Sequence, residues 1–187
     1  VLYSGIISGD TFTGSYTGAF SNANVGTGKT VTITSSYSGA DTGNYSVTDQ
    51  SSTTADISAK ALTATASVSN KTYDATSSAT ATLTLSGLVG LETLGTTNAS
   101  TFNNKNVGTG KTVTVNSITL ADGTNGGLAA NYSISAGQTT TANITAKSLT
   151  VSGITASNKI YDGNSVASLD ASSVAYSGLI SGDTFNG

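Results

Sequence analysis

A glycine-rich segment followed by a lysine is the part of this sequence that comes nearest to a known binding motif. Residues 23–30 read Ala-Asn-Val-Gly-Thr-Gly-Lys-Thr, which satisfies the relaxed pattern of a phosphate-binding loop. In such a loop the backbone amides hold phosphates, the lysine reaches the terminal ones, and a helix follows. Residues 31–34 instead alternate as a strand does, and the second copy of the segment has Lys105 where the first glycine or alanine belongs. We therefore interpret the segment as a glycine-assisted turn into a strand.

Two sets of recurring carboxylates have the residue type required for general acid or base catalysis. Asp10, Glu92 and Asp183 occupy equivalent places, each before a threonine, and Asp74 and Asp162 follow a tyrosine in a second motif. Aspartate favours turns, in which its side chain accepts backbone amides. We therefore expect these carboxylates to be structural, and the sequence predicts no catalytic residue, no cofactor-binding residue and no cofactor.

Two pairs of residues offer the oxygen atoms that calcium prefers. Asp41 lies near Asn44, and Asp122 lies near Asn125. Calcium takes about six to eight oxygen ligands, and neither pair belongs to a recognisable calcium loop. We expect plain hydrated loops at both places and predict no metal site.

Lysines and threonines also recur, and each allows a special chemistry. A lysine can be crosslinked to an asparagine when the lysine is desolvated and neutral beside a buried acid. Most of the recurring lysines in this chain instead border turns, where we expect them to stay solvated and to protect strand edges from pairing. The alternating threonines of 30–34 and 112–114 could present a flat hydroxyl array to ice or to a glycan, although threonines on the outer face of any strand share this spacing. The recurring lysines are Lys29, Lys60, Lys71, Lys111, Lys147 and Lys159.

The composition argues against several classes of function. Serine, threonine, glycine and asparagine supply 100 of the 187 residues, charged residues make up 9%, and histidine, cysteine and arginine do not occur. Without imidazole or thiolate, most catalytic chemistries, zinc sites and disulfides are excluded, so we expect no enzyme. The net charge of −3 does not suit nucleic acid, and no apolar run reaches the roughly 20 residues that span a bilayer. We predict neither nucleic-acid binding nor membrane insertion.

The chain repeats itself with a period of 87 or 88 residues. Residues 24–32 return letter for letter at 106–114, and the segment 55–63 returns in related form at 142–150. A match of this length does not arise by chance. The repeats are therefore the main source of information about the fold.

Cutting the chain at the recurring Ala-Lys-x-Leu-Thr segment gives three predicted domains. Residues 1–62 form a partial repeat without its N-terminal strands, 63–149 form a complete repeat, and 150–187 form a partial repeat without its C-terminal strands. Residues 3–12 reappear at 176–185 with one substitution. We expect the partial repeats to be completed by neighbouring repeats of a longer array or by head-to-tail copies of the chain.

Apolar residues alternate with polar ones within each repeat, as in 62–68. A period of two indicates strands with one buried face, and no segment shows helical spacing. The short strands and intervening turns predict an all-β fold of tandem antiparallel, Ig-like β-sandwich repeats of about 87 residues, with Leu83, Val113, Tyr132 and Ile144 buried. A β-solenoid is the alternative, disfavoured because no shorter period occurs within the repeat.

Several ordered motifs carry a family resemblance. Residues 158–163 read Asn-Lys-Ile-Tyr-Asp-Gly, 177–183 read Ser-Gly-Leu-Ile-Ser-Gly-Asp, and 106–111 read Asn-Val-Gly-Thr-Gly-Lys. Together with the closing segments 131–133 and 141–147, they resemble the YDG repeat of large secreted bacterial adhesins, which include filamentous haemagglutinin-like surface proteins.

The resemblance implies a structural role outside the cell. We expect stalk or spacer repeats of a bacterial cell-surface adhesin or extracellular filament, which support adhesion and biofilm formation, with a host or matrix glycan as a further partner. The alternative is a glycan- or ice-binding adhesin module. The middle repeat has Ala75 where Gly163 stands in the last one. We therefore expect that this turn does not need a backbone conformation reserved for glycine.

Overall fold

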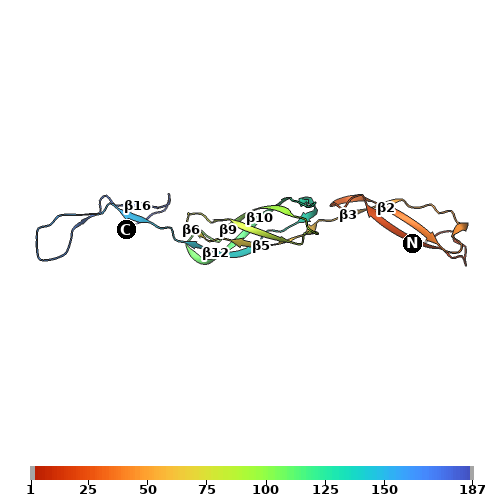
Figure 1. Cartoon of the computed structure of the whole chain (residues 1–187), viewed down its shortest axis with the longest axis horizontal. Helices are drawn as coiled ribbons and strands as arrows, with labels where there is room; N and C mark the ends of the chain where they lie inside the picture. Colours follow the sequence, from red (N-terminus) through yellow and green to blue (C-terminus); the bar gives the residue numbers. More distant parts are fainter. Residues whose placement is uncertain (1–2, 186–187) are drawn as a thin grey trace. The chain divides into compact units, whose positions relative to one another are not determined.

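The computed structural model describes residues 3–185 and shows an all-β chain (Figure 1). This range contains sixteen strands and two short 3-10 turns, arranged in several small sheets. Threonine and valine, which favour extended backbone, are abundant in these strands. The predicted all-β class is confirmed. Among the residues described, no helix is long and apolar enough to cross a membrane.

Contacts between residues divide the chain into two compact units. The first consists of the chain up to Leu62 together with Gly87–Leu94 and Asp122–Ser133. The second consists of Thr63–Ser86, Gly95–Ala121 and the chain from Ile134 onward. Both units include parts of the middle repeat, and the repeat boundaries drawn from the sequence stay a prediction.

The first unit contains a three-stranded antiparallel sheet in the order β1-β2-β3. Its strands are β1 (Thr13–Phe20), β2 (Gly26–Ser38) and β3 (Ser52–Ile57), and η1 (Thr42–Asn44) lies in the connection between β2 and β3. The same unit holds a short parallel pair, β4 (Lys60–Ala61) with β11 (Tyr132–Ser133), and β11 follows η2 (Ala129–Asn131) directly.

The second unit contains a five-stranded sheet in the order β6-β12-β10-β9-β7. In Figure 1, β6, β9, β10 and β12 can be followed side by side, with β5 next to them. β12 pairs antiparallel with β10 and parallel with β6, and β7 pairs antiparallel with β9. The strands are β6 (Lys71–Thr72), β7 (Ser78–Ala79), β9 (Leu94–Phe102), β10 (Gly108–Asp122) and β12 (Thr139–Thr145).

Three further antiparallel ladders belong to the second unit. β5 (Thr63–Val68) pairs with β8 (Ala81–Ser86) over six residue pairs and contacts β12. Near the C-terminus the ladders are shorter and consist of β13 (Thr150–Ser152) with β16 (Ala175–Ser177) and β14 (Thr155–Ala156) with β15 (Leu169–Asp170).

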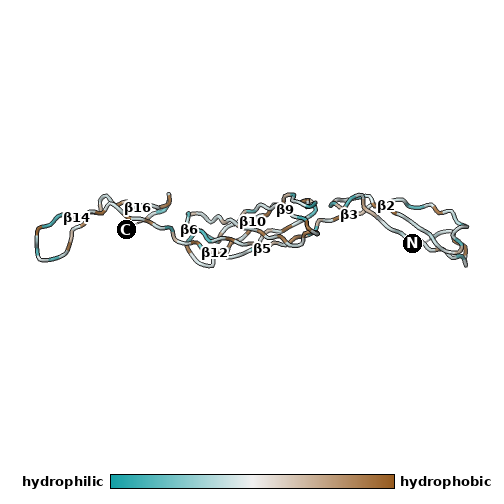
Figure 2. Tube along the Cα trace, in the orientation of Figure 1, coloured by the Kyte–Doolittle hydropathy of each residue, from teal (hydrophilic) through white to brown (hydrophobic). Residues whose placement is uncertain are grey.

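The main hydrophobic core lies on the five-stranded sheet. Phe102, Val113, Ala142 and Ile144 are buried together, and Val68, Tyr73 and Ala79 pack against them. These residues come from alternate positions of their strands, as the period of two predicts. Figure 2 shows the result along the chain, where hydrophobic and hydrophilic residues are interspersed over short intervals.

Three of the four residues predicted to be buried are buried, and one is not. Val113, Tyr132 and Ile144 are almost inaccessible to solvent, whereas Leu83 is only half-buried. Leu83 lies in β8, which pairs with β5 and stands outside the five-stranded sheet that holds the main core. The prevailing antiparallel pairing also differs from the parallel stacking of β-helical coils.

Candidate functional site

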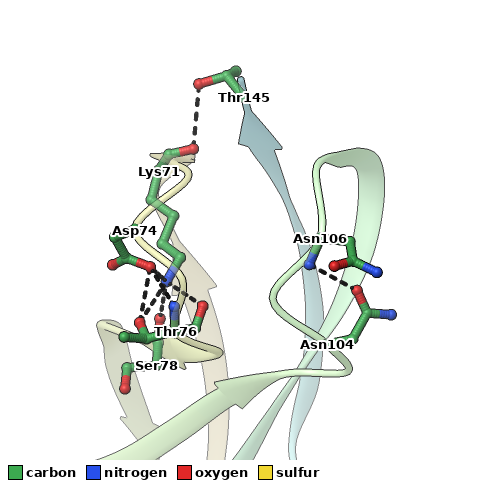
Figure 3. A network of polar contacts seen from close by, with 7 residues as sticks. All are labelled: Lys71, Asp74, Thr76, Ser78, Asn104, Asn106 and Thr145. Carbon is green, nitrogen blue, oxygen red and sulfur yellow. Dashed lines mark hydrogen bonds and ion pairs between the residues drawn. The ribbon is translucent and has the colours of Figure 1, made fainter. Parts of the chain in front are cut away.

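Lys71 organises a closed polar loop at the edge of the five-stranded sheet (Figure 3). Its Nζ donates to Oδ1 of Asp74 at 2.8 Å, to the carbonyl and hydroxyl oxygens of Thr76 at 2.9 and 3.0 Å, and to the carbonyl oxygen of Ser78 at 3.0 Å. The Lys71 side chain is 18% exposed and that of Asp74 52%. Thr145 Oγ1 donates to the backbone carbonyl of Lys71 at 3.3 Å and so ties the loop to β12.

The Asp74 carboxylate is stabilised in its ionised form. The hydrogen bond from Lys71 is the largest cause, and the backbone amide and hydroxyl of Thr76 add to it, so that the pKa of Asp74 is lowered to about 2. The ammonium is surrounded by oxygen acceptors that use all of its donors. This geometry makes a clamp for a loop, which agrees with a structural lysine and a structural aspartate.

The same clamp occurs in the last repeat. Lys159 Nζ donates to Oδ1 of Asp162 at 2.8 Å and to the carbonyl and side-chain oxygens of Asn164, each at 2.8 Å. The hydrogen bond from Lys159 lowers the pKa of Asp162, with a further contribution from the Asn164 amide. The recurring Asn-Lys-x-Tyr-Asp motif therefore encodes a lysine clamp, a name used below for these two loops.

The turn inside the lysine clamp corrects one prediction. Ala75 has φ of +62°, and Gly163 at the equivalent place has φ of +75°. Both copies thus adopt the left-handed conformation, which L-residues rarely enter. The expectation that this turn does not need such a conformation is wrong, and Ala75 adopts it where hydrogen bonds from Lys71 and from the Thr76 amide to Asp74 hold the turn.

Asp10 and Glu92, two of the three equivalent carboxylates that precede a threonine, each accept a hydrogen bond from a tyrosine that the sequence did not pair with them. Tyr132 donates its hydroxyl hydrogen to the Glu92 carboxylate and accepts the backbone amide of Val89 at 3.0 Å. In the first repeat Tyr45 donates to Asp10 at 2.6 Å and accepts the amide of Ile7 at 2.9 Å. We refer to this arrangement as the tyrosine latch.

The tyrosine latch fastens a turn of the first unit in each of two repeats. The amides of Asp10 and Glu92 donate to the carbonyl oxygens three residues before them, which closes the turn. The hydrogen bonds to Asp10 and Glu92 raise the pKa values of Tyr45 and Tyr132 respectively. The carboxylates are turn residues, as predicted, but their side chains accept a phenol rather than a backbone amide. The recurrence of this tyrosine 87 residues later was the available signal.

Asp183, the third member of the set, has a different partner. Its amide closes the same kind of turn on Ile180, but its Oδ1 accepts the hydroxyl of Tyr73 at 3.2 Å. This hydrogen bond is the largest cause of the raised pKa of Tyr73. The tyrosine latch itself is therefore seen twice within residues 3–185.

The phosphate-loop-like segment opens a strand in both copies. At Gly26–Lys29 in β2 and at Gly108–Lys111 in β10 the register shifts in the manner of a β-bulge. The second glycine is left-handed and its amide donates to a side chain of the neighbouring strand, Asp56 in one copy and Asn143 in the other. The amides of Gly28 and Gly110 therefore already have acceptors. The segment continues as strand β2 in one copy and as strand β10 in the other, whereas a phosphate-binding loop is followed by a helix.

The side chains considered for calcium binding or crosslinking form hydrogen bonds within loops. Asp41 accepts the amide and hydroxyl of Thr11, and Asp122 accepts the amide of Ala129. Between residues 3 and 185, no group of three or more His, Cys, Asp or Glu side chains converges on a point where a metal could bind. Lys111 Nζ donates to the Asn104 side chain at 2.6 Å in an exposed position, where a lysine stays solvated.

The threonines of 30–34 and 112–114 lie on the exposed face of their strands, except Thr114, which is half-buried. Thr30, Thr32 and Thr34 are exposed while Val31 and Ile33 between them turn inward. This alternation is that of an ordinary strand with one covered face. In β10 Val113 and Val115 are fully buried, so the threonines that alternate with them owe their spacing to the core beneath them.

Comparison with known proteins identifies the family. The model of the YDG domain matches residues 1–55, 58–142 and 145–186, which together cover nearly the whole chain. The chain therefore belongs to the YDG domain family. No curated protein and no solved structure matches the chain significantly.

Proposed function

We propose that this member of the YDG domain family is a non-catalytic stalk or spacer segment of a secreted bacterial adhesin or extracellular filament. The proposal rests on the observation that the recurring polar residues hydrogen-bond within the fold and close its loops and turns. The lysine clamp occurs in two repeats and the tyrosine latch in two, and in each case the charged or phenolic group closes a loop or turn of its own repeat. Residues preserved between repeats are thus the ones that hold the fold.

A stalk that supports adhesion and biofilm formation must keep its modules folded under tension at the cell surface. Sheets fastened by polar clamps at their edges and turns suit this task, because each repeat carries its own fastenings and does not depend on one large core. We also propose that each complete repeat is an Ig-like β-sandwich, with the β5-β8 ladder and the five-stranded sheet as its two layers.

Single-molecule stretching of the full chain tests the stalk function. Each complete repeat of about 87 residues should unfold as one event that lengthens the chain by about 30 nm, because an extended residue spans about 3.3–3.6 Å. Extension without resolved unfolding forces would contradict a load-bearing role. Antibody labelling of intact cells, with lysed cells as the control, tests the proposed surface location.

A glycan- or ice-binding module is the second candidate, and the exposed threonine rows and an aromatic hollow in the first repeat are the features that favour it. A glycan array and an ice-affinity assay on the full chain separate it from the stalk function. Specific binding in either assay would show that the chain does more than separate other modules.

A further inference from the structure

The chain passes from the first repeat into the middle repeat through a segment that is itself paired. Strand β3 of the first sheet ends at Ile57, and β4 (Lys60–Ala61) begins after two residues. β4 pairs in parallel with β11 (Tyr132–Ser133) of the middle repeat. A flexible linker would behave as a random coil without strand pairing. The recurring Ala-Lys-x-Leu-Thr segment is therefore folded as a strand of the repeat that follows it.

Leu62, the residue after β4, is buried in the same place. It is 6% exposed, and its amide donates to the carbonyl oxygen of Ser133 at 2.8 Å. Gly87 packs on it, since a Cβ placed on this glycine would lie 3.5 Å from Leu62 Cδ2. A Cβ on Gly178 would lie at the same distance from Leu149 Cδ2. The leucine of the recurring segment thus packs on a Ser-Gly turn in both places.

A second connection joins the first two repeats beside this segment. The backbone amide of Val25 donates to Oδ1 of Asn131 at 2.9 Å, and Nδ2 of Asn131 donates to Oδ1 of Asn24 at 3.1 Å. Asn131 ends η2 of the middle repeat, whereas Asn24 and Val25 precede β2 of the first repeat. An asparagine side chain can accept and donate at once, which both bonds require. We call this pair of hydrogen bonds the asparagine clasp.

The two connections leave the first repeat at neighbouring strands. Gly26, next to Val25, pairs with Ile57 at the end of β3. Adjacent strands of a sheet lie about 4.8 Å apart. A single covalent connection would let the following segment pivot, whereas a second bond beside it opposes the pivot. In agreement, contacts between residues place the first repeat in one compact unit with Gly87–Leu94 and Asp122–Ser133 of the middle repeat.

We propose that these contacts form a rigid joint, in which the tip of the middle repeat, residues 87–94 and 122–133, docks on the end of the first repeat. The partner of this surface is the preceding repeat of the same chain, and Asn131 is the residue that recognises it. The inference rests on the proposed function, because a stalk made of repeats must transmit force from one repeat to the next. It adds the residues through which one repeat holds its neighbour.

Closure of the joint links the stability of the two repeats. Opening it would return Leu62 to solvent and leave the Val25 amide without its acceptor. In repeat proteins, stability is approximately the sum of the intrinsic stabilities of the repeats and of the interfaces between neighbours. A change of Asn131 in the middle repeat should therefore alter the protection of Val25 in the first repeat.

Amide hydrogen exchange of the full chain, followed residue by residue by NMR, tests the joint. In the unmodified chain the amides of Val25 and Leu62 should exchange far more slowly than free amides. Asn131→Ala should speed exchange at Val25 by about twofold to tenfold, because the acceptor of that amide is lost. Exchange at the free-amide rate at either position of the unmodified chain would overturn the joint.

Asn116→Ala is the matched control. Nδ2 of Asn116 donates to Oγ1 of Thr101 at 3.0 Å, a bond of the same kind made within the middle repeat. This variant should leave exchange at Val25 unchanged. If Asn116→Ala speeds that exchange as much as Asn131→Ala does, the effect is a general loss of stability and the asparagine clasp is contradicted.

A double-mutant cycle tests the direct contact between the two asparagines. Asn24 is exposed, so Asn24→Ala should keep the fold. Asn24→Ala and Asn131→Ala combined should lower the stability to urea by less than the sum of the two single changes, because both remove the same hydrogen bond. Additive losses would contradict the contact.

Backbone relaxation of residues 58–62 gives a reading that needs no variant. Order parameters of about 0.85, as in rigid strands, are expected, and values below about 0.6 would overturn the joint. Such a result would leave the stalk function standing if the stretched chain still shows resolved unfolding events. A closed joint in a chain that extends without unfolding forces would contradict the stalk function alone, so the two failures can be told apart.

Discussion

The ammonium groups of Lys71 and Lys159 each hold a loop by donating to a carboxylate, a backbone carbonyl and a further side-chain oxygen, and Lys71 also donates to the carbonyl of Ser78. A backbone that bends sharply leaves carbonyl groups without strand partners, and a lysine with three donors can satisfy several of them at once. The lysine clamp therefore explains why an Asn-Lys-x-Tyr-Asp motif recurs in a chain with few charges. Its chemistry is that of a hydrogen-bond donor and a fixed positive charge.

Acid should weaken the lysine clamp, and Asp74→Asn should remove this dependence. The pKa of Asp74 is lowered to about 2 from an ordinary value of 3.8. A carboxyl with a depressed folded pKa contributes stability above its unfolded pKa, and that contribution disappears as the pH falls through the folded value. We expect the unmodified chain to lose stability between about pH 4 and pH 2, and Asp74→Asn to lose less.

Urea denaturation at a series of pH values measures this effect. Lys71→Met is the companion variant and should also flatten the acid limb, because it removes the charge that depresses the Asp74 pKa. Equal pH dependence in all three proteins would contradict the assigned role of the lysine clamp.

Ala75→Gly should stabilise the protein by about 1 kcal/mol. Ala75 has φ of +62°, where an L-residue is strained and glycine is not. Part of the gain is offset by the greater freedom of glycine in the unfolded chain. Thermal or urea denaturation measures the change. Ala79→Gly is the control and should destabilise, because it removes a methyl group that packs against the hydrophobic core.

At the scale of the elements, long hairpins are fastened by side chains as well as by ladders. The bulge at the start of β2 and β10 turns a backbone amide toward a side-chain oxygen of the neighbouring strand. The tyrosine latch joins β11 to the turn that precedes β9. Short strands such as β11, with two residues, gain from these polar links what they lack in ladder length.

Tyr132→Phe should lower the melting temperature by several degrees. The change leaves the Glu92 carboxylate and the Val89 amide without the hydroxyl that they share, in a partly buried position. Tyr161→Phe is the matched control, because Tyr161 is 94% exposed and should tolerate the loss of its hydroxyl. Equal melting temperatures for the two variants would show that the tyrosine latch contributes nothing to stability.

At the scale of the whole molecule, burial is uneven between equivalent positions. Val113 is fully buried in the middle repeat, while Val31 at the equivalent place in the first repeat is only half-buried. The two share the same strand position and the same local sequence, so the difference comes from β5, β6 and β7. We therefore expect truncation of Val113 to destabilise the fold more than truncation of Val31.

Val113→Ala should therefore cost about 2 kcal/mol, from two lost methyl groups and the cavity left behind. Val31→Ala should cost less than about 1 kcal/mol in dilute solution, because solvent already reaches that site. Hydrogen exchange of the amides in β10 and β2 reports the two regions separately. Equal losses of protection in the two variants would contradict the uneven burial.

Much of the fold follows from local patterns. Alternation of apolar and polar residues predicted strands that include Val113 and Ile144, and their burial is confirmed. The same pattern placed Leu83 in the core, yet alternation shows only that a face is apolar and not how much protein covers it. The partner of a recurring carboxylate also escaped prediction, since Tyr132 lies 40 residues beyond Glu92.

The all-β class, the repeat period and the family can all be read from the sequence, because strand propensity, turn residues and exact recurrence are properties of short segments. Which groups meet across the fold can be seen only in the folded chain. The hydroxyl of Tyr132 on Glu92 and the burial of Phe102 in the hydrophobic core both depend on segments distant in sequence. Such contacts are selected by packing and hydrogen bonding across the sheet, which no single segment contains.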